Sequence, residues 1–386
     1  MHYRKLQADS IFDGHRLLQN QVLILTADNS IEGVVPASEA GEEVQRFDGI
    51  LTPGLINCHC HLELSHLKGI IKPRTGIVDF LLGVIEARQA PGTGKQEAMA
   101  AAEAELYVQG VSGVADISNT GDSITLKKNS RIRWHNLVEV INFMEGNASE
   151  KLETYNTICK QYEQHNLASA LAPHAPYTVN EATFKWINKN TAGEIISIHN
   201  QESKAENQLF ENGNGVFLKL YKQVAGGVNP LAVSRKSSLR TWLPHFTNGQ
   251  TILMVHNTFI KEEDLLFARE HEKKYGLQLL YCLCANANLY IENCLPPIDL
   301  LLHHHCTIVL GTDSYSSNWQ LNLASEINAI RKEHPSISLE TMLGWVTSNA
   351  ASAMRWKDLG AFERGKKPGV VLMKVDAGVL KSTRII

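Results

Sequence analysis

Eight short apolar segments recur along the middle of the chain, and most of them are followed by a longer amphipathic or polar segment. This alternation is typical of βα units built around a parallel sheet. We expect strands at residues 55–59, 113–117, 136–141, 168–172, 195–199, 251–256, 277–282 and 307–310. Eight such units fit a TIM-type (β/α)8 barrel, an α/β fold whose catalytic groups lie at the carboxyl ends of its strands. A doubly wound parallel sheet remains the alternative, because periodicity does not separate the two folds.

The two ends of the chain have a different pattern. Residues 1–51 alternate short apolar and polar stretches, are interrupted by turn residues such as Asp13-Gly14, and lack a sustained helical period. Residues 358–386 contain another β-type run at 369–373. We therefore expect a small composite β-sandwich formed by residues 1–51 and 358–386, next to a barrel domain over residues 52–357.

Composition and charge narrow the class of protein. The chain has 44% hydrophobic and 20% charged residues, which is typical of a globular protein. A formal net charge of -3 offers no electrostatic basis for binding nucleic acid. No apolar run reaches the roughly 18 residues that a membrane span needs, and the start of the chain lacks the apolar segment of a signal peptide. Seven scattered cysteines favour reduced thiols. We expect a cytoplasmic protein that binds neither nucleic acid nor membranes.

The first expected strand ends in two histidines, His59 and His61, separated by one residue. Alternate residues of a strand point to the same face, so the two imidazoles share a face while Cys58 and Cys60 point away from it. Two neutral imidazoles at a strand end form half of a site for a metal such as zinc. Taken alone, the pair would more simply be two histidines packed at a strand end.

Polar side chains also close three other expected strands. His199 ends the fifth strand and is followed by Glu202, His256 ends the sixth, and Asp313 follows the eighth. Any one of them alone would most simply be a residue that makes ordinary hydrogen bonds at a strand end. Their coincidence on four strands, counting His59, instead predicts an active site at the carboxyl edge of the barrel.

Together these segments resemble the amidohydrolase superfamily, in the branch that contains the cytosine, guanine and adenosine-type deaminases and the triazine chlorohydrolases. The matching segments are residues 53–57 running into His59-x-His61, the segment 172–178, His199-x-x-Glu202, His256, residues 284–289, Gly311-Thr312-Asp313-Ser314 and residues 360–366. Two positions depart from the family pattern, because Ala285 replaces a proline and Ala287 replaces a serine.

The resemblance implies metal ligands, and it implies catalytic roles for Glu202, His256 and Asp313. The implied ligands are His59, His61, His199 and Asp313. Glu202 and His256 are implied as acid–base and electrophilic groups, and Asp313 as the acceptor of a proton from water. A divalent ion lowers the pKa of its bound water from about 15.7 to about 7. Binuclear relatives carry a lysine at the end of strand four, whereas this chain has none there. We therefore expect one ion, Zn²⁺ with Fe²⁺ as the alternative.

The substrate is expected to be a small heteroaromatic amine. The run from His59 to Ser65 resembles the aminodeoxyfutalosine deaminases, which implies an adenosine modified at its 5′ position. A guanine or pterin deaminase and a chlorohydrolase are the alternatives, and an inactive scaffold is disfavoured because every implied ligand is present. Candidate substrate contacts are Glu63, His174 and Asn142, each of which could instead be structural. Phe80 could form an apolar wall, and the family resemblance implies a homodimer.

Overall fold

The computed structural model describes residues 3–89, 94–144, 148–227 and 229–386. Within them each of the eight expected central strands is present, with ends that differ by a few residues from those expected. The strands are β6 (Leu55–Cys60), β7 (Val111–Ser118), β8 (Arg133–Val140), β9 (Ala168–Pro173), β10 (Ile195–Asn200), β11 (Thr251–His256), β12 (Gln278–Leu283) and β13 (Ile308–Leu310). All neighbouring pairs in the orders β6-β7-β8-β9 and β10-β11-β12-β13 are parallel.

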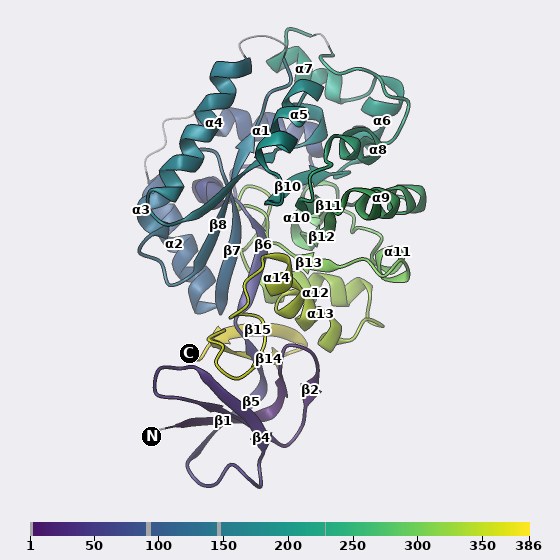
Figure 1. Ribbon diagram of the computed structural model, residues 1–386. Helices are drawn as coiled ribbons and strands as arrows, with labels where there is room; N and C mark the ends of the chain where they lie inside the picture. The colour runs from purple at the N-terminus through teal and green to yellow at the C-terminus, as the bar shows by residue number, and fades with distance from the viewer. Residues whose placement is uncertain (1–2, 90–93, 145–147, 228) are drawn as a thin grey trace.

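Over the described ranges, these strands form two four-stranded sheets rather than one continuous sheet. The two sheets touch at both edges. At one edge the amide of His199, in β10, donates to the carbonyl of His174 at a distance of 2.9 Å. At the other edge the amides of Thr312 and Asp313 donate to the carbonyl of His59 at 2.9 and 3.0 Å. Figure 1 shows the strands surrounded by helices.

Along the chain, most of the central strands are followed by one or more helices. They are α1 (Ile77–Gln89), α2 (Lys95–Val108), α3 (Ile124–Lys127), α4 (Ala148–Glu163), α5 (Glu181–Asn190), α6 (Lys204–Asn212), α7 (Phe217–Val224), α8 (Ser238–Trp242), α9 (Glu262–Tyr275), α10 (Ala285–Ile291), α11 (Ile298–His303), α12 (Leu323–Glu333), α13 (Leu339–Trp345) and α14 (Ser348–Ala353). Local sequence sets several ends. The Ser203 side chain accepts from the amide of Glu206 at the start of α6, and Gly213, with φ 72°, ends that helix.

Two hydrophobic layers follow from the alternation of side chains along the strands. Ile56, Cys58, Leu253 and Cys282 belong to one buried cluster. A larger cluster contains outward-facing strand residues packed against the helices. Cys58 is fully buried in the former cluster and Cys60 in the larger one, so the two cysteines do not share a face as expected; the pairing of β6 with β7 shifts register between Asn57 and Cys60. No cysteine of the described residues joins a potential metal-ligand group.

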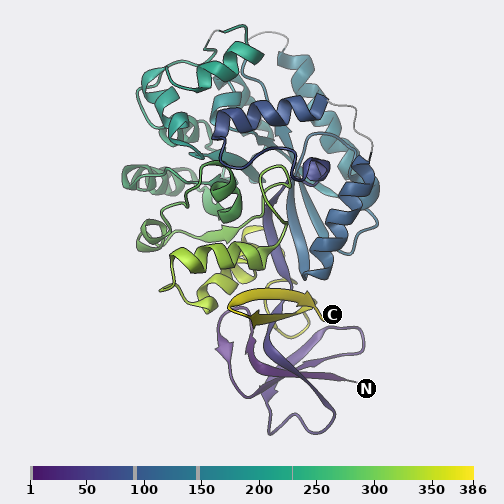
Figure 2. The same ribbon diagram turned by 180° about the vertical axis from the view of Figure 1, so that it is seen from behind.

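Both ends of the chain contribute to one β unit, which lies below the larger domain in Figures 1 and 2. Its strands are β1 (Arg4–Phe12), β2 (Leu17–Leu18), β3 (Gln21–Leu25), β4 (Ile31–Pro36), β5 (Val44–Pro53), β14 (Val370–Asp376) and β15 (Val379–Arg384). They form a seven-stranded sheet in which β14 pairs with β5. The expected association of the two termini is therefore present. None of the helices in the described ranges has the length and hydropathy to cross a membrane.

Candidate metal centre and active-site cavity

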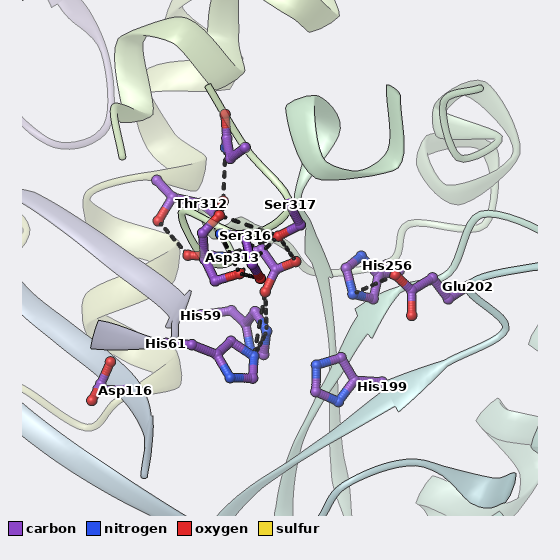
Figure 3. Close-up of polar contacts among 12 residues, drawn as sticks. His59, His61, Asp116, His199, Glu202, His256, Thr312, Asp313, Ser316 and Ser317 are labelled. Atoms are coloured by element: carbon purple, nitrogen blue, oxygen red, sulfur yellow. Dashed lines mark hydrogen bonds and ion pairs between the residues drawn. The ribbon is translucent and has the colours of Figure 1, made fainter. Parts of the chain in front are cut away.

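Four side chains from the carboxyl ends of the central strands converge on one point (Figure 3). The ligand atoms of His59, His61, His199 and Asp313 all lie within 4.8 Å of one another. The Nε2 atoms of His59 and His61 are 3.1 Å apart. They lie 3.4 and 3.3 Å from Oδ1 of Asp313, respectively. Tetrahedral nitrogen ligands of zinc are separated by about 3.3 Å, given bond lengths of about 2.0–2.1 Å. The cluster therefore fits a metal site.

The protonation of these groups also suits a metal. Burial, outweighing the attraction of Asp313, lowers the pKa of both His59 and His61 to about 4, so both imidazoles are neutral at pH 7. Burial would raise the pKa of Asp313, but the hydrogen bond with His59 and the neighbouring imidazoles hold it well below its usual range. Neutral imidazole and ionised carboxylate are the forms that bind metal.

The atoms that face away from the cluster hold the ligands in orientation. Nδ1 of His199 donates to the carbonyl of His174 at 2.7 Å, which leaves Nε2 of His199 as the free ligand atom. The hydroxyl of Ser317 donates to Oδ2 of Asp313 at 2.5 Å. These bonds restrict the ligand rotamers, as in a preformed metal site.

The backbone at the strand ends is unusual. Gln201, His256 and Asp313 have φ values of 46°, 73° and 57°, in the left-handed region that residues other than glycine seldom adopt. Such conformations cluster at functional sites, where the surrounding structure imposes them. Gly311 is required for a different reason, since a Cβ at this position would lie 2.6 Å from Cβ of His59.

Glu202 and His256 form a buried pair beside the metal-ligand cluster (Figure 3). Oε1 of Glu202 lies 3.4 Å from Nε2 of His256, and Nδ1 of His256 lies 3.1 Å from Oδ1 of Asn288. Burial, together with nearby carboxylates, raises the pKa of Glu202 to about 8 despite the opposing effect of His199. Burial lowers the pKa of His256. At pH 7 the pair is therefore a protonated carboxyl group next to a neutral imidazole.

The loop that carries Glu202 is fixed by Glu206, a residue that the sequence alone did not single out. Its carboxylate accepts from the amides of Gln201 and Glu202 at 2.9 and 3.2 Å. Glu206 itself lies in the first turn of α6 and is fully buried. The sequence offered little indication of this role, because a glutamate in the first turn of a helix is common at the protein surface.

A cavity of about 370 Å³ opens over this site. Its floor includes His61, His199, Glu202, His256 and Asp313. Its walls are mainly apolar and come from α1, from α7 and from the segment after β8; they include Ile77, Phe80, Leu81, Val84, Ile85, Leu220, Tyr221, Val224, Ile141 and Phe143. Phe80 is thus at the wall where an apolar residue was expected.

Of the three residues expected to contact the substrate, His174 lies at the cavity, whereas Glu63 and Asn142 do not. His174 lines the cavity, with Nδ1 2.7 Å from the hydroxyl of Thr178. Glu63 and Asn142 are not among the lining residues. The Glu63 carboxylate accepts from the amides of Asn119 and Thr120 at 3.0 and 3.2 Å, while the Asn142 amide donates to Thr183 Oγ1 at 2.8 Å. Both side chains stabilise neighbouring loops, so the structure does not bring them to the expected place.

Glu139 lines the cavity and was not among the expected residues. It lies next to the last residue of β8 and is 4% exposed. Burial would raise the pKa of Glu139, but His174, His61 and His199 outweigh it and hold the pKa at about 2. An acidic residue near a strand end, within an otherwise apolar run, was the signal that could have indicated it.

Comparisons with known proteins agree with this geometry. A model of the amidohydrolase family matches residues 50–384. An aminodeoxyfutalosine deaminase of Nitratiruptor sp. is 25% identical over 322 residues, covering 80% of this chain and 73% of the relative. A 5-methylthioadenosine/S-adenosylhomocysteine deaminase of Teredinibacter turnerae is 24% identical over 387 residues, covering 94% of this chain and 81% of the relative.

A solved structure has the same fold. The Helicobacter pylori aminofutalosine deaminase in complex with methylthio-coformycin superimposes with a TM-score of 0.81 at 22% identity. The match covers 97% of this chain and 92% of that one.

Proposed function

The chain belongs to the amidohydrolase family, and from this membership we propose that it is a metal-dependent deaminase of aminopurine nucleosides. The reaction consumes one water, replaces the ring amino group by a carbonyl and releases ammonia. The observation that carries the proposal is the pair of Glu202 and His256, 3.4 Å apart and buried directly beside the cluster of His59, His61, His199 and Asp313. Hydrolysis at a ring carbon needs a proton donor and a proton acceptor at the same place.

One divalent ion, Zn²⁺, would be held by the three histidines and Asp313. Three imidazoles and one carboxylate are ligands that zinc prefers, and the ion supplies Lewis acidity that makes hydroxide available at neutral pH. The end of β9 carries no lysine that could bridge a second ion, which supports a single ion.

The side chains can move the protons that the reaction requires. Asp313, which is ionised, accepts a proton from the attacking water. Glu202, which is protonated at pH 7, donates its proton to a ring nitrogen, so that the adjacent carbon can accept the hydroxide. His256 stabilises the tetrahedral centre that develops. The proton held by Asp313 then passes to the amino group, which leaves as ammonia, and the hydroxyl proton of the tetrahedral centre passes to Glu202 as the carbonyl forms.

The shape of the cavity supports a substrate with an apolar substituent. The polar floor can hold the heteroaromatic ring, while the walls from α1 and α7 are apolar. A free guanine or a pterin has no apolar substituent to fill these walls, whereas an adenosine can carry one at its 5′ position. The names of both relatives reported above also refer to such adenosine derivatives. We therefore favour a 5′-modified adenosine, including aminodeoxyfutalosine.

Further proposals concern architecture. The two sheets act as one (β/α)8 barrel over residues 52–357, since both of their edges meet at the ligand-bearing strand ends. Residues 1–51 and 358–386 form the accessory β-sandwich, and the protein acts as a homodimer.

The function is tested by ammonia release from zinc-loaded protein with 5′-modified adenosines, guanine, pterins, cytosine and chlorotriazines. We expect turnover of a 5′-modified adenosine, and its loss by more than about 100-fold in Asp313→Asn and Glu202→Gln. Glu181→Gln, which alters an exposed residue of α5, is the matched control and should keep full activity. Near-normal activity of Asp313→Asn or Glu202→Gln would refute the assigned roles. If protein with one bound metal ion releases no ammonia from any of these compounds, the proposed substrate class is refuted.

A further inference from the structure

Glu139 has a carboxylate oxygen that the protein itself does not satisfy. Its Oε2 accepts from the side-chain amide of Asn119 at 2.7 Å. Its Oε1 is buried and has no hydrogen-bond partner among the described residues. Leaving a buried carboxylate oxygen without a donor is unfavourable, and native structures rarely do so without a reason. Since Glu139 also lines the cavity, a group inside the cavity is the natural source of the missing donor.

A second metal ion does not explain this oxygen. The ligand atoms of Glu139, His174 and His199 do lie within 4.8 Å of one another. However, Nδ1 of His199 is already bonded to a carbonyl, and its one remaining nitrogen belongs to the four-residue cluster. Only two ligands are then left, and their atoms, Oε1 of Glu139 and Nε2 of His174, are 3.9 Å apart. Two ligands are too few for a second zinc site, which takes at least three protein ligands.

The position of Glu139 indicates which part of a substrate would reach it. A row of imidazole rings separates Glu139 from Glu202. The ring of His174 lies 4.9 Å from that of His199, and the ring of His199 lies 5.4 Å from that of His256, which contacts Glu202. Glu139 stands at the His174 end of this row and Glu202 at the other. A heteroaromatic ring that reacts beside Glu202 and Asp313 would therefore present to Glu139 the part of the substrate farthest from the amino group.

We propose that Oε1 of Glu139 accepts hydrogen bonds from the vicinal hydroxyls of the substrate's ribose, and that Glu139 thereby selects ribonucleosides. This inference rests on the proposed function. A carboxylate can only accept, and a sugar diol is the donor-rich part of a nucleoside that lies away from the amino group. Asn119 is a positioning residue, since it holds Oε2 of Glu139 and in turn accepts from Nη2 of Arg88 at 3.2 Å. The hydroxyl-binding role expected for Glu63, which follows β6, is thus assigned to a glutamate of β8, two strands further along the chain.

The proposal is tested with 5′-deoxyadenosine and 2′,3′,5′-trideoxyadenosine, two ligands that differ only in the diol. Zinc-loaded wild type, Glu139→Gln and Glu181→Gln are compared by kcat/KM for ammonia release, by calorimetric Kd and by metal content. For wild type, kcat/KM should be at least about 10-fold higher with 5′-deoxyadenosine than with the trideoxy compound. Glu139→Gln should lose roughly 10- to 100-fold on 5′-deoxyadenosine and less than about 3-fold on the trideoxy compound. Glu181→Gln, which alters an exposed glutamate of α5 outside the cavity, should leave kcat/KM and Kd for both ligands unchanged.

Three results would overturn the proposal. They are a wild-type preference for the diol below about 3-fold, an equal loss on both ligands in Glu139→Gln, or a second equivalent of metal that this variant loses. The first result is measured on wild type alone, so it tests the proposal even if Glu139→Gln does not fold. If wild type releases no ammonia but its Kd still discriminates between the ligands in a Glu139-dependent way, the deaminase function fails while the diol site stands.

Discussion

A buried ion pair beneath the metal-ligand cluster allows a quantitative prediction. Nζ of Lys127 lies 2.6 Å from Oδ2 of Asp116, and both side chains are fully buried. Lys127 also donates to Asn136 Oδ1 at 2.7 Å and to Ser118 Oγ at 3.2 Å. The other oxygen of Asp116 accepts from the amide of Leu62 at 2.8 Å, immediately after His61. The pair therefore connects the interior of the protein to the backbone of a proposed ligand.

Replacing Lys127 by Met would leave the Asp116 carboxylate buried and unpaired. At a separation of 2.6 Å the Coulomb attraction is about 6 kcal/mol with an effective dielectric constant of about 20. Desolvation of the two ions offsets much of this energy, and removal of one partner of a buried pair costs about 3–5 kcal/mol. We expect Lys127→Met to lower the free energy of unfolding by that amount. The double variant Lys127→Met/Asp116→Asn should be about 2 kcal/mol more stable than Lys127→Met, because its asparagine is uncharged and still accepts from the amide of Leu62.

Urea unfolding of the metal-loaded protein measures these differences. Lys128→Met, which alters the adjacent exposed lysine, is the control and should stay within about 0.5 kcal/mol of wild type. A loss below about 1 kcal/mol in Lys127→Met, or a double variant as unstable as the single one, would refute the reasoning.

Three further predictions concern the metal site. Gly311→Ala should weaken zinc binding at least about 10-fold and lower the free energy of unfolding by about 1–3 kcal/mol, because the new methyl group would overlap His59. An unchanged Kd for zinc would contradict this prediction. His59→Ala should reduce bound metal below about a tenth of an equivalent, while Cys58→Ser should keep one equivalent because Cys58 packs in the interior cluster; equal metal content in the two variants would point to another site. Removal of metal by a chelator should lower the unfolding free energy, by about 2.7 kcal/mol relative to protein with free zinc at 100 times its Kd; an identical thermal midpoint would show that the ion does not bind the folded state preferentially.

Much of the candidate metal centre was predictable from the sequence. A strand period of two predicts His59 and His61 on one side of a strand end. Their Nε2 atoms do meet, 3.1 Å apart, although β6 ends at Cys60 and its pairing shifts register just before that residue. The apolar runs that precede His199, His256 and Asp313 mark strand ends, and the carboxyl ends of parallel strands share one edge. These are local properties of the chain, so composition and spacing determined them. The same holds for helix boundaries such as the Ser203 cap of α6.

The substrate side of the cavity was decided by tertiary structure. Glu63 and Glu139 are both glutamates close to the ends of strands, and nothing in their local sequence distinguishes their roles. Glu63 is turned into a loop by the amide of Asn119, 56 residues away along the chain, while the Asn119 side chain holds only one oxygen of Glu139. The left-handed backbone at Asp313 likewise occurs where its amide donates to the carbonyl of His59, on another strand. Side-chain direction after a strand end depends on partners that are distant in sequence. The sequence alone therefore determined which strands carry the candidate metal ligands, and only the folded chain determined which carboxylate faces the cavity.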